Sequence, residues 1–273
     1  MIQSNPQNTT GITEAIELGK QRRSIAFLPF VPAGYPDLQT TVATLIELQH
    51  AGADAIEVGI PFSDPVADGP VIQEAFAHAL AAKVRVADTL QAIAEARRVL
   101  TIPVLAMVSF SIVYRYGLQS FLKNAKSVGI SGLILPDLPP PEGQRICAQV
   151  NDAGLDTVLL VAPTTTVERR AEIARLSTGF IYYLSVSGIT GARAALPVNL
   201  TEGVRNLKQM TDRPICVGFG ISKAEHLAQL RGLADGAIVG SALVKAMKAQ
   251  IANGSTAVAS AAGAYARELL ATA

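Results

Sequence analysis

The feature that most constrains the fold is an alternation of short apolar runs, rich in β-branched residues, with longer segments of helical periodicity. Parallel strands covered by helices on both faces have this continuous apolar pattern. Eight runs occur, at residues 24–31, 55–59, 103–108, 132–135, 156–161, 180–185, 214–218 and 236–240. Apolar residues at helical spacing fill the segments between them, including residues 38–51, 118–128, 142–153, 167–176 and 223–230. Eight strand–helix units predict an α/β fold, a closed (β/α)₈ TIM barrel.

An open doubly wound sheet is the alternative architecture. It usually has fewer strands and a GxGxxG turn after the first strand, and no such turn follows residues 24–31. We predict a single TIM-barrel domain over residues 1–273, with the barrel itself at about 11–250. Residues 12–21 are expected to form an extra N-terminal helix that closes the bottom, and the Ala-rich tail 251–273 a terminal helix outside the barrel.

Composition excludes several other classes of protein. Hydrophobic residues make up 49 % of the chain and charged residues 16 %, which suits a large core and not a disordered chain. The net charge of +1 argues against a nucleic-acid binder. The apolar, uncharged stretch 99–114 contains a proline and is too short to cross a bilayer. Without a secretory signature or paired cysteine spacing, the chain is expected to be cytoplasmic and to bind no metal.

Glu57 is the first candidate for catalysis. It lies inside the apolar second run, where an ionised carboxylate without partners would be costly. Its pKa should therefore rise, as suits a group that gives and takes protons near neutral pH. The alternative is a glutamate satisfied by an inward-facing Tyr or Ser, with no role in turnover. Of the adjacent Tyr182 and Tyr183, one should face the lumen and could reach Glu57, but the sequence does not say which.

The proline-rich loop after the second run presents two further carboxylates, Asp64 and Asp68. Its restricted backbone should hold both near the barrel mouth, where active sites of such barrels lie. Asp68 is expected to face Glu57 across a ligand. The alternative for both aspartates is an Asx turn or a helix cap, and for Asp64 also a contact with a partner protein.

Glycines follow three of the later strands. Gly220 follows the seventh run, Gly240 and Ser241 follow the eighth, and Gly191 ends a glycine-rich turn after the sixth. Backbone N–H groups at such turns, and a helix that starts at Ser241, predict a phosphate site. Apolar residues, among them Phe30, could hold an aromatic part of the ligand. The three histidines lie in helical patterns away from any nucleophile, which disfavours Ser-His-Asp chemistry.

Several motifs resemble those of the tryptophan synthase alpha chain family. They are LPFV and GYPD within residues 28–37, EVGIPFSDPVADGP at 57–70, PDLP at 136–139, VAPTT at 161–165, GITGAR at 188–193 and GFGI at 218–221. The resemblance runs from about residue 11 to 248. It implies cleavage of indole-3-glycerol phosphate to indole and glyceraldehyde 3-phosphate, a retro-aldol reaction that needs no cofactor on this chain.

The resemblance also assigns roles to residues. Glu57 would protonate C3 of the indole and then remove the hydroxyl proton, while Asp68 would accept the indole N–H. Tyr182 would hydrogen-bond the catalytic glutamate. The phosphate contacts would be Gly191, Gly220, Gly240 and Ser241. The resemblance further implies a beta chain that carries pyridoxal phosphate, in an alpha2beta2 tetramer.

One departure from the family pattern concerns this partner. Where the family has Tyr-Tyr-Asn-Pro after the third strand, this chain has Ser-Phe-Ser-Ile at 109–112, a loop expected to face the beta chain through Ser111, as Asp64 does. Pro32, where Thr is usual, is a smaller departure. The remaining alternatives are a free-standing lyase without a beta partner, a non-catalytic ligand-binding regulator of a partner enzyme, and another phosphate-binding barrel enzyme.

Overall fold

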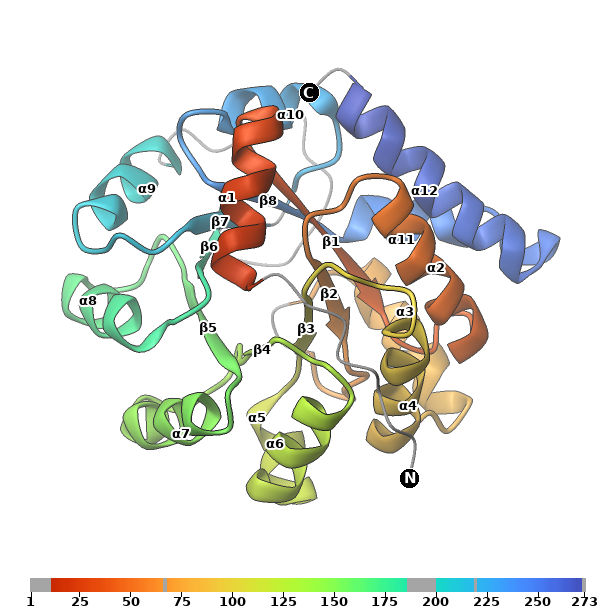
Figure 1. Ribbon diagram of the computed structural model, residues 1–273, viewed down its shortest axis with the longest axis horizontal. Helices are drawn as coiled ribbons and strands as arrows, with labels where there is room; N and C mark the ends of the chain where they lie inside the picture. The colour runs from red at the N-terminus through yellow and green to blue at the C-terminus, as the bar shows by residue number, and fades with distance from the viewer. Residues whose placement is uncertain (1–10, 66–67, 186–199, 219, 272–273) are drawn as a thin grey trace.

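The barrel predicted from the apolar runs is present. The computed structural model describes residues 11–65, 68–185, 200–218 and 220–271. Eight parallel strands pair in chain order and close between β8 and β1, with helices around the outside (Figure 1). The strands are β1 (Ala26–Pro32), β2 (Ile56–Gly59), β3 (Val104–Met107), β4 (Gly132–Ile134), β5 (Asp156–Val161), β6 (Ile181–Leu184), β7 (Ile215–Gly218) and β8 (Gly236–Val239). Each agrees with its predicted run to within two residues.

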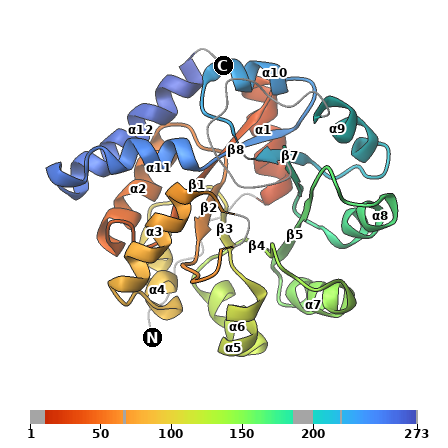
Figure 2. The ribbon, with the colours of Figure 1, turned by 180° about the vertical axis from the view of Figure 1, so that it is seen from behind.

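Helices follow each strand on the outer layer. In chain order they are α1 (Ile12–Arg23), α2 (Leu38–His50), α3 (Pro70–Ala81), α4 (Val86–Ala96), α5 (Phe110–Tyr116), α6 (Leu118–Ser127), α7 (Pro140–Asp152), α8 (Val167–Leu176), α9 (Leu200–Lys208), α10 (Ala224–Leu230), α11 (Ser241–Lys248), the 3₁₀ turn η1 (Ile251–Asn253) and α12 (Ser255–Ala271). Seen from behind, the strands lead into α3 and α11 at the opposite end of the barrel from α1 (Figure 2). The predicted loop at 109–112 is in fact mostly helical, because Ser109 caps α5.

Alternation along the strands sorts side chains into a lumen and an outer layer. The register places Phe30, Glu57 and Leu105 side by side on neighbouring strands. On β6, Tyr182 belongs to the lumen cluster and Tyr183 to the core between strands and helices. The structure therefore resolves which tyrosine faces inward.

The extra N-terminal helix closes the bottom as predicted. Ile12 and Ile16 of α1 pack against the lumen cluster. At the end of α1, Arg22 and Arg23 both pair with the fully buried carboxylate of Asp54, which also accepts the backbone N–H of Phe27 at 2.8 Å. One carboxylate thus holds α1 to the start of β1 and β2.

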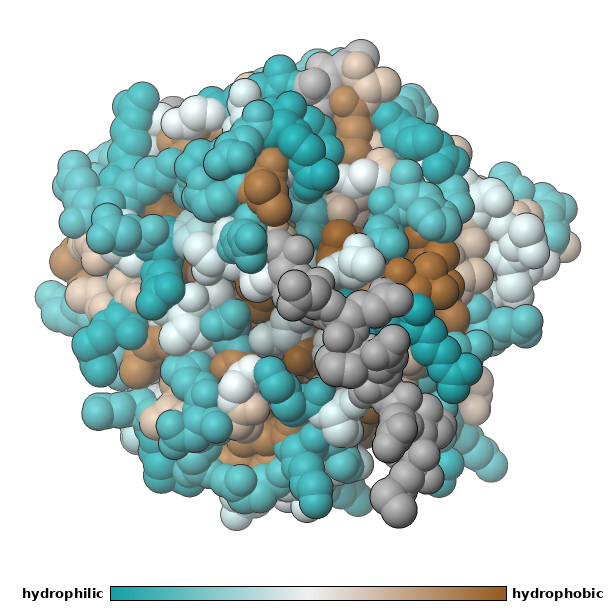
Figure 3. Space-filling view, in the orientation of Figure 1, coloured by the Kyte–Doolittle hydropathy of each residue, from teal (hydrophilic) through white to brown (hydrophobic). Residues whose placement is uncertain are grey.

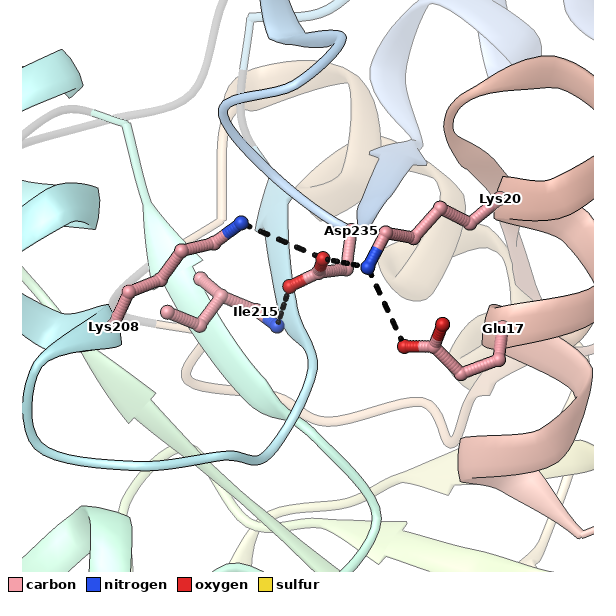
Figure 4. Close-up of polar contacts among 5 residues, drawn as sticks. All are labelled: Glu17, Lys20, Lys208, Ile215 and Asp235. Atoms are coloured by element: carbon pink, nitrogen blue, oxygen red, sulfur yellow. Dashed lines mark hydrogen bonds and ion pairs between the residues drawn. The ribbon is translucent and has the colours of Figure 1, made fainter.

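Asp235 does the same for β7 and β8 (Figure 4). Its carboxylate lies 2.8 Å from Lys20 Nζ and 3.5 Å from Lys208 Nζ, and accepts the N–H of Ile215 at 2.9 Å. Burial alone would raise the pKa of Asp235, but the hydrogen bonds from Lys20 and Ile215 and the lysine charges outweigh it and lower that pKa. The sequence analysis missed both carboxylates.

The tail predicted to form an outer helix does so as α12, which packs along α2 and α11 (Figure 1). Gly263 of α12 allows this close approach, since a Cβ there would lie 2.4 Å from Glu47 Oε1. Arg267 donates to the same carboxylate at 2.8 Å.

The face that carries α1 is largely covered by hydrophilic side chains, with smaller apolar areas between them (Figure 3). Within the described ranges, none of the helices has both the length and the apolar character required to span a membrane.

Candidate active site

Glu57 lies in the lumen of the barrel and is 0 % exposed. Neither carboxyl oxygen has a hydrogen-bond partner in the described part of the chain. Burial alone raises the pKa of Glu57 well above its ordinary value, as expected for a carboxyl group taken out of water. A buried polar group without a partner requires an explanation. Here burial disfavours the ionised form of the group, and both of its oxygens remain available for a ligand.

Asp68 lies at the barrel mouth, between the end of β2 and the start of α3. It is half-buried, and burial raises the pKa of its carboxyl group to about 6. Its backbone is held on both sides: its N–H donates to Pro65 O at 3.2 Å, and its carbonyl accepts from Gln73 Nε2 at 2.8 Å. Burial thus raises the pKa of both carboxyl groups, and more strongly for the fully buried Glu57 than for the half-buried Asp68, so the two groups suit different roles.

Tyr182 also lies in the lumen of the barrel. Its side chain is 4 % exposed, and its pKa is raised well above the ordinary value by burial first and then by the charges of Glu57 and Asp68. Both carboxyl groups thus act on one hydroxyl in the lumen. The ring of Tyr182 crosses to β7, where a Cβ on Gly218 would lie 2.4 Å from its hydroxyl oxygen.

The hydrogen bond from Tyr182 to the glutamate, which the resemblance implies, is not formed. Among the residues that the structure describes, neither oxygen of Glu57 has a hydrogen-bond partner, so the tyrosine does not satisfy them. The expectation of a direct bond is therefore wrong for this structure, because the ring lies over Gly218 and its hydroxyl does not meet the carboxyl group. Without that bond, Glu57 cannot be interpreted as a structural glutamate that this tyrosine satisfies.

Phe30 lies beside the acid, as its register with Glu57 requires. Its ring packs over Gly59, where a Cβ would lie 2.4 Å from Phe30 Cζ. It also packs against Gly240, at the end of the neighbouring strand β8. Phe76 contacts it edge-on, with ring centroids 6.4 Å apart. An apolar aromatic wall therefore stands next to the acid and next to one of the predicted phosphate residues.

The predicted phosphate residues come from two strand ends in the described structure. Gly220 follows β7 with φ +86°, a conformation that favours glycine. Gly240 precedes α11, and Ser241 is its first residue, so the free N–H groups of the first turn of α11 lie at the barrel mouth. Both glycines and Ser241 are half-buried. Gly191, which ends the predicted glycine-rich turn after the sixth strand, lies outside the described residues.

The two predicted partner residues are at the surface. Asp64 is exposed and lines an open groove of about 560 Å³ with Phe62, Pro65 and Leu80. Ser111 is exposed on α5, and its hydroxyl lies 2.7 Å from that of Ser109.

The sequence analysis missed the residues that hold the loops at the barrel mouth in place. Asp137, in the loop after β4, accepts from Ser109 Oγ at 2.6 Å and from the N–H of Phe110 at 2.7 Å. It thereby fixes the start of α5, as Gln73 fixes Asp68. The available signal for Asp137 was its place in the PDLP motif directly after a strand. As for a metal centre, His, Cys, Asp and Glu form no cluster of three or more that could hold an ion in the ranges described.

Comparisons with known proteins agree with this architecture. The family model for the tryptophan synthase alpha chain matches residues 16–272. The alpha chain of Rhodopirellula baltica is 46 % identical over 230 residues, 83 % of this chain and 82 % of that one. The alpha chain of Synechococcus sp. CC9902 is 45 % identical over 264 residues, 96 % and 97 % of the two chains.

Solved structures give the same result. A chain of tryptophan synthase from Mycobacterium tuberculosis matches with a TM-score of 0.85 and 36 % identity, covering 96 % of this chain and 99 % of that one. A mutant tryptophan synthase alpha-subunit from Pyrococcus furiosus matches with a TM-score of 0.83 and 35 % identity, covering 90 % and 98 %.

The barrel and its two unlike carboxyl groups define a (β/α)₈-barrel enzyme of the acid–base type. The matches make the assignment specific: the chain belongs to the tryptophan synthase alpha chain family. The prediction of a lyase subunit in tryptophan biosynthesis is thereby confirmed at the level of the family.

Proposed function

We propose that this chain cleaves indole-3-glycerol phosphate to indole and glyceraldehyde 3-phosphate, as the alpha subunit of tryptophan synthase. The observation that supports this most strongly is the state of Glu57, a fully buried carboxyl group with a raised pKa, whose two oxygens have no hydrogen-bond partner in the described ranges of the chain. A group in that state can deliver a proton to a bound ligand and take one back.

The proposed reaction uses one carboxyl group twice, first as a proton donor and then as a proton acceptor. Protonated Glu57 gives its proton to C3 of the indole ring, and the ring becomes cationic. The resulting carboxylate removes the proton from the hydroxyl on the adjoining glycerol carbon. That oxygen becomes the aldehyde oxygen, the bond between its carbon and C3 breaks, and the bonding electrons return to the ring. Indole leaves and Glu57 is protonated again.

Asp68 has the complementary role. Above pH 6 or so its carboxylate is ionised and can accept the indole N–H. It would stabilise the positive charge that the ring acquires when C3 is protonated. The aromatic wall at Phe30 would hold the indole, while Gly220, Gly240 and Ser241, with Gly191, would bind the phosphate through backbone N–H groups and the start of α11.

We propose a beta chain as the partner, in an alpha2beta2 tetramer, and pyridoxal phosphate on that chain only. The exposed Asp64, beside its groove, and Ser111 on α5 are the proposed contacts. The reaction above needs no group on this chain beyond its own side chains. We also propose the cytoplasm as its location, since Cys147 and Cys216 are both free and buried.

The direct test is indole release from indole-3-glycerol phosphate by the purified chain, alone and with a tryptophan synthase beta chain. Strong activation by the beta chain supports the tetramer. High turnover by the isolated chain, unchanged by a beta chain, supports the second candidate, a free-standing lyase, which the Ser-Phe-Ser-Ile segment at 109–112 favours. Tight binding of the substrate without any release of indole identifies a regulator.

A further inference from the structure

The segment between β7 and α10 is held by side chains from two helices. Ser222 lies two residues after Gly220, on the short connection to α10. Its N–H donates to His226 Nδ1 at 3.2 Å, and its carbonyl accepts from the hydroxyl of Tyr265 at 3.0 Å. Both polar backbone groups of this residue are therefore satisfied by side chains, one from α10 and one from α12. Ile221, between Gly220 and Ser222, is anchored in the core.

The donor and the acceptor are each fixed in their roles. Burial, with a smaller effect of the Glu268 charge, raises the pKa of Tyr265 to about 12, so its hydroxyl keeps its proton in any ordinary assay. His226 is 2 % exposed. Because a backbone N–H donates to Nδ1, the imidazole holds its proton on Nε2. Neither contact depends on a side chain that moves freely in water.

Helix α12 links this segment to the other strand end of the predicted phosphate site. It packs along α11, which begins at Ser241 (Figure 1). Its Tyr265 donates to the carbonyl of Ser222, two residues after Gly220. One helix therefore contacts the supports of both the Gly220 turn and the Ser241 turn. Backbone N–H groups bind an anion well only when they are held in position before it arrives.

We infer that Tyr265 and His226 are positioning residues for phosphate binding: they hold Ser222, and through it the Gly220 turn, in the geometry that binds the phosphate of the ligand. This rests on the proposed function in so far as Gly220 contacts the phosphate. Neither side chain touches the reacting atoms. Loss of either contact should therefore weaken phosphate binding and leave the chemical step unchanged.

The test measures binding of glycerol 3-phosphate to the full chain by titration calorimetry. Tyr265→Phe removes one hydrogen bond and keeps the ring, and we expect the Kd to rise about two- to tenfold, the range of one net hydrogen bond. His226→Leu should have a similar effect. His226→Asn places an acceptor near the former Nδ1 and should restore much of the affinity.

Tyr116→Phe is the matched control. It removes a tyrosine hydroxyl that accepts from Asn124 Nδ2 at 2.9 Å, at the end of α5 and away from the glycine turns. Its Kd should equal that of the parent chain, while its melting temperature should fall about as much as that of Tyr265→Phe. Equal weakening in Tyr116→Phe and Tyr265→Phe would mean a purely structural effect and would overturn the inference, as would parent-like affinity in both Tyr265→Phe and His226→Leu.

Indole release separates this inference from the proposed function. With indole-3-glycerol phosphate as substrate, Tyr265→Phe should raise KM by the same factor as the Kd and leave kcat within about twofold. If the parent chain binds glycerol 3-phosphate but releases no indole, the proposed reaction is wrong. The binding data then still decide whether Tyr265 and His226 position the Gly220 turn. A parent chain that does not bind glycerol 3-phosphate contradicts both.

Discussion

Replacing Asp68 by Asn should stabilise the protein near neutral pH while removing activity. Burial raises the pKa of Asp68 from an ordinary 3.8 to about 6. A rise of that size corresponds to about 3 kcal/mol against the ionised form. Because Asp68 is half-buried, solvent screening reduces this. We therefore expect Asp68→Asn, which carries no charge, to raise the free energy of unfolding by about 1–2 kcal/mol at pH 7.

The sign of the effect gives a second, independent check. Between pH 3.8 and about 6 the folded parent keeps a proton that its unfolded chain gives up, so this group makes the parent less stable as the pH rises through that window. The gain of Asp68→Asn should be absent below pH 4 and complete above pH 6. Glu57 is present in both the parent and Asp68→Asn, so its effect on the pH dependence of stability largely cancels when the two proteins are compared.

Urea denaturation of the full chain at pH 4 to 7.5, followed by circular dichroism, measures this difference. Asp64→Asn makes the same change on an exposed side chain of the same loop and should change stability by less than about 0.5 kcal/mol. An Asp68→Asn protein that is no more stable than the parent at pH 7, or whose gain is already complete at pH 4, would refute the reasoning.

Three further substitutions test the packing and the support of the site. Gly218→Ala should destabilise the protein by about 1–3 kcal/mol and lower indole release, because its Cβ would lie 2.4 Å from the Tyr182 hydroxyl oxygen. Thermal melting measures the first effect and the indole assay the second. A variant unchanged in both would contradict the placement of the Tyr182 ring. Asp54→Ala should cost about 3 kcal/mol in urea denaturation with kcat unchanged, since it leaves the Phe27 N–H and two arginines without their carboxylate. Asp137→Asn should leave basal indole release unchanged and weaken activation by a beta chain, because it loosens the start of α5; equal activation of variant and parent would exclude that role.

The fold could be predicted from the sequence because its information is local. A strand covered on both faces must be apolar throughout, and eight such runs were visible with their boundaries nearly correct. The start of α5 at Phe110 was not predicted: Ser109 caps it locally, but Asp137, which is distant in sequence, holds that cap by accepting from Ser109 Oγ and from the N–H of Phe110. Local patterns do not record which distant side chain satisfies a helix end.

The site was predictable in part for the same reason. Glu57 stood out as a carboxylate within an apolar run, and its burial is confirmed. The orientation of Tyr182 required the register of the strands, and its missing bond to Glu57 required the position of Gly218. The support of Ser222 by Tyr265 joins residues 43 positions apart, and no periodicity in the sequence indicates such a pair.

The central claim is that the buried carboxyl group of Glu57 transfers the proton that breaks the carbon–carbon bond. Glu57→Gln keeps the shape of the buried group but has no carboxyl proton to exchange. We predict a fall in kcat for indole release of about 10²–10⁴-fold or more, with melting temperature and glycerol 3-phosphate binding close to those of the parent. A Glu57→Gln protein that releases indole as fast as the parent would contradict the account.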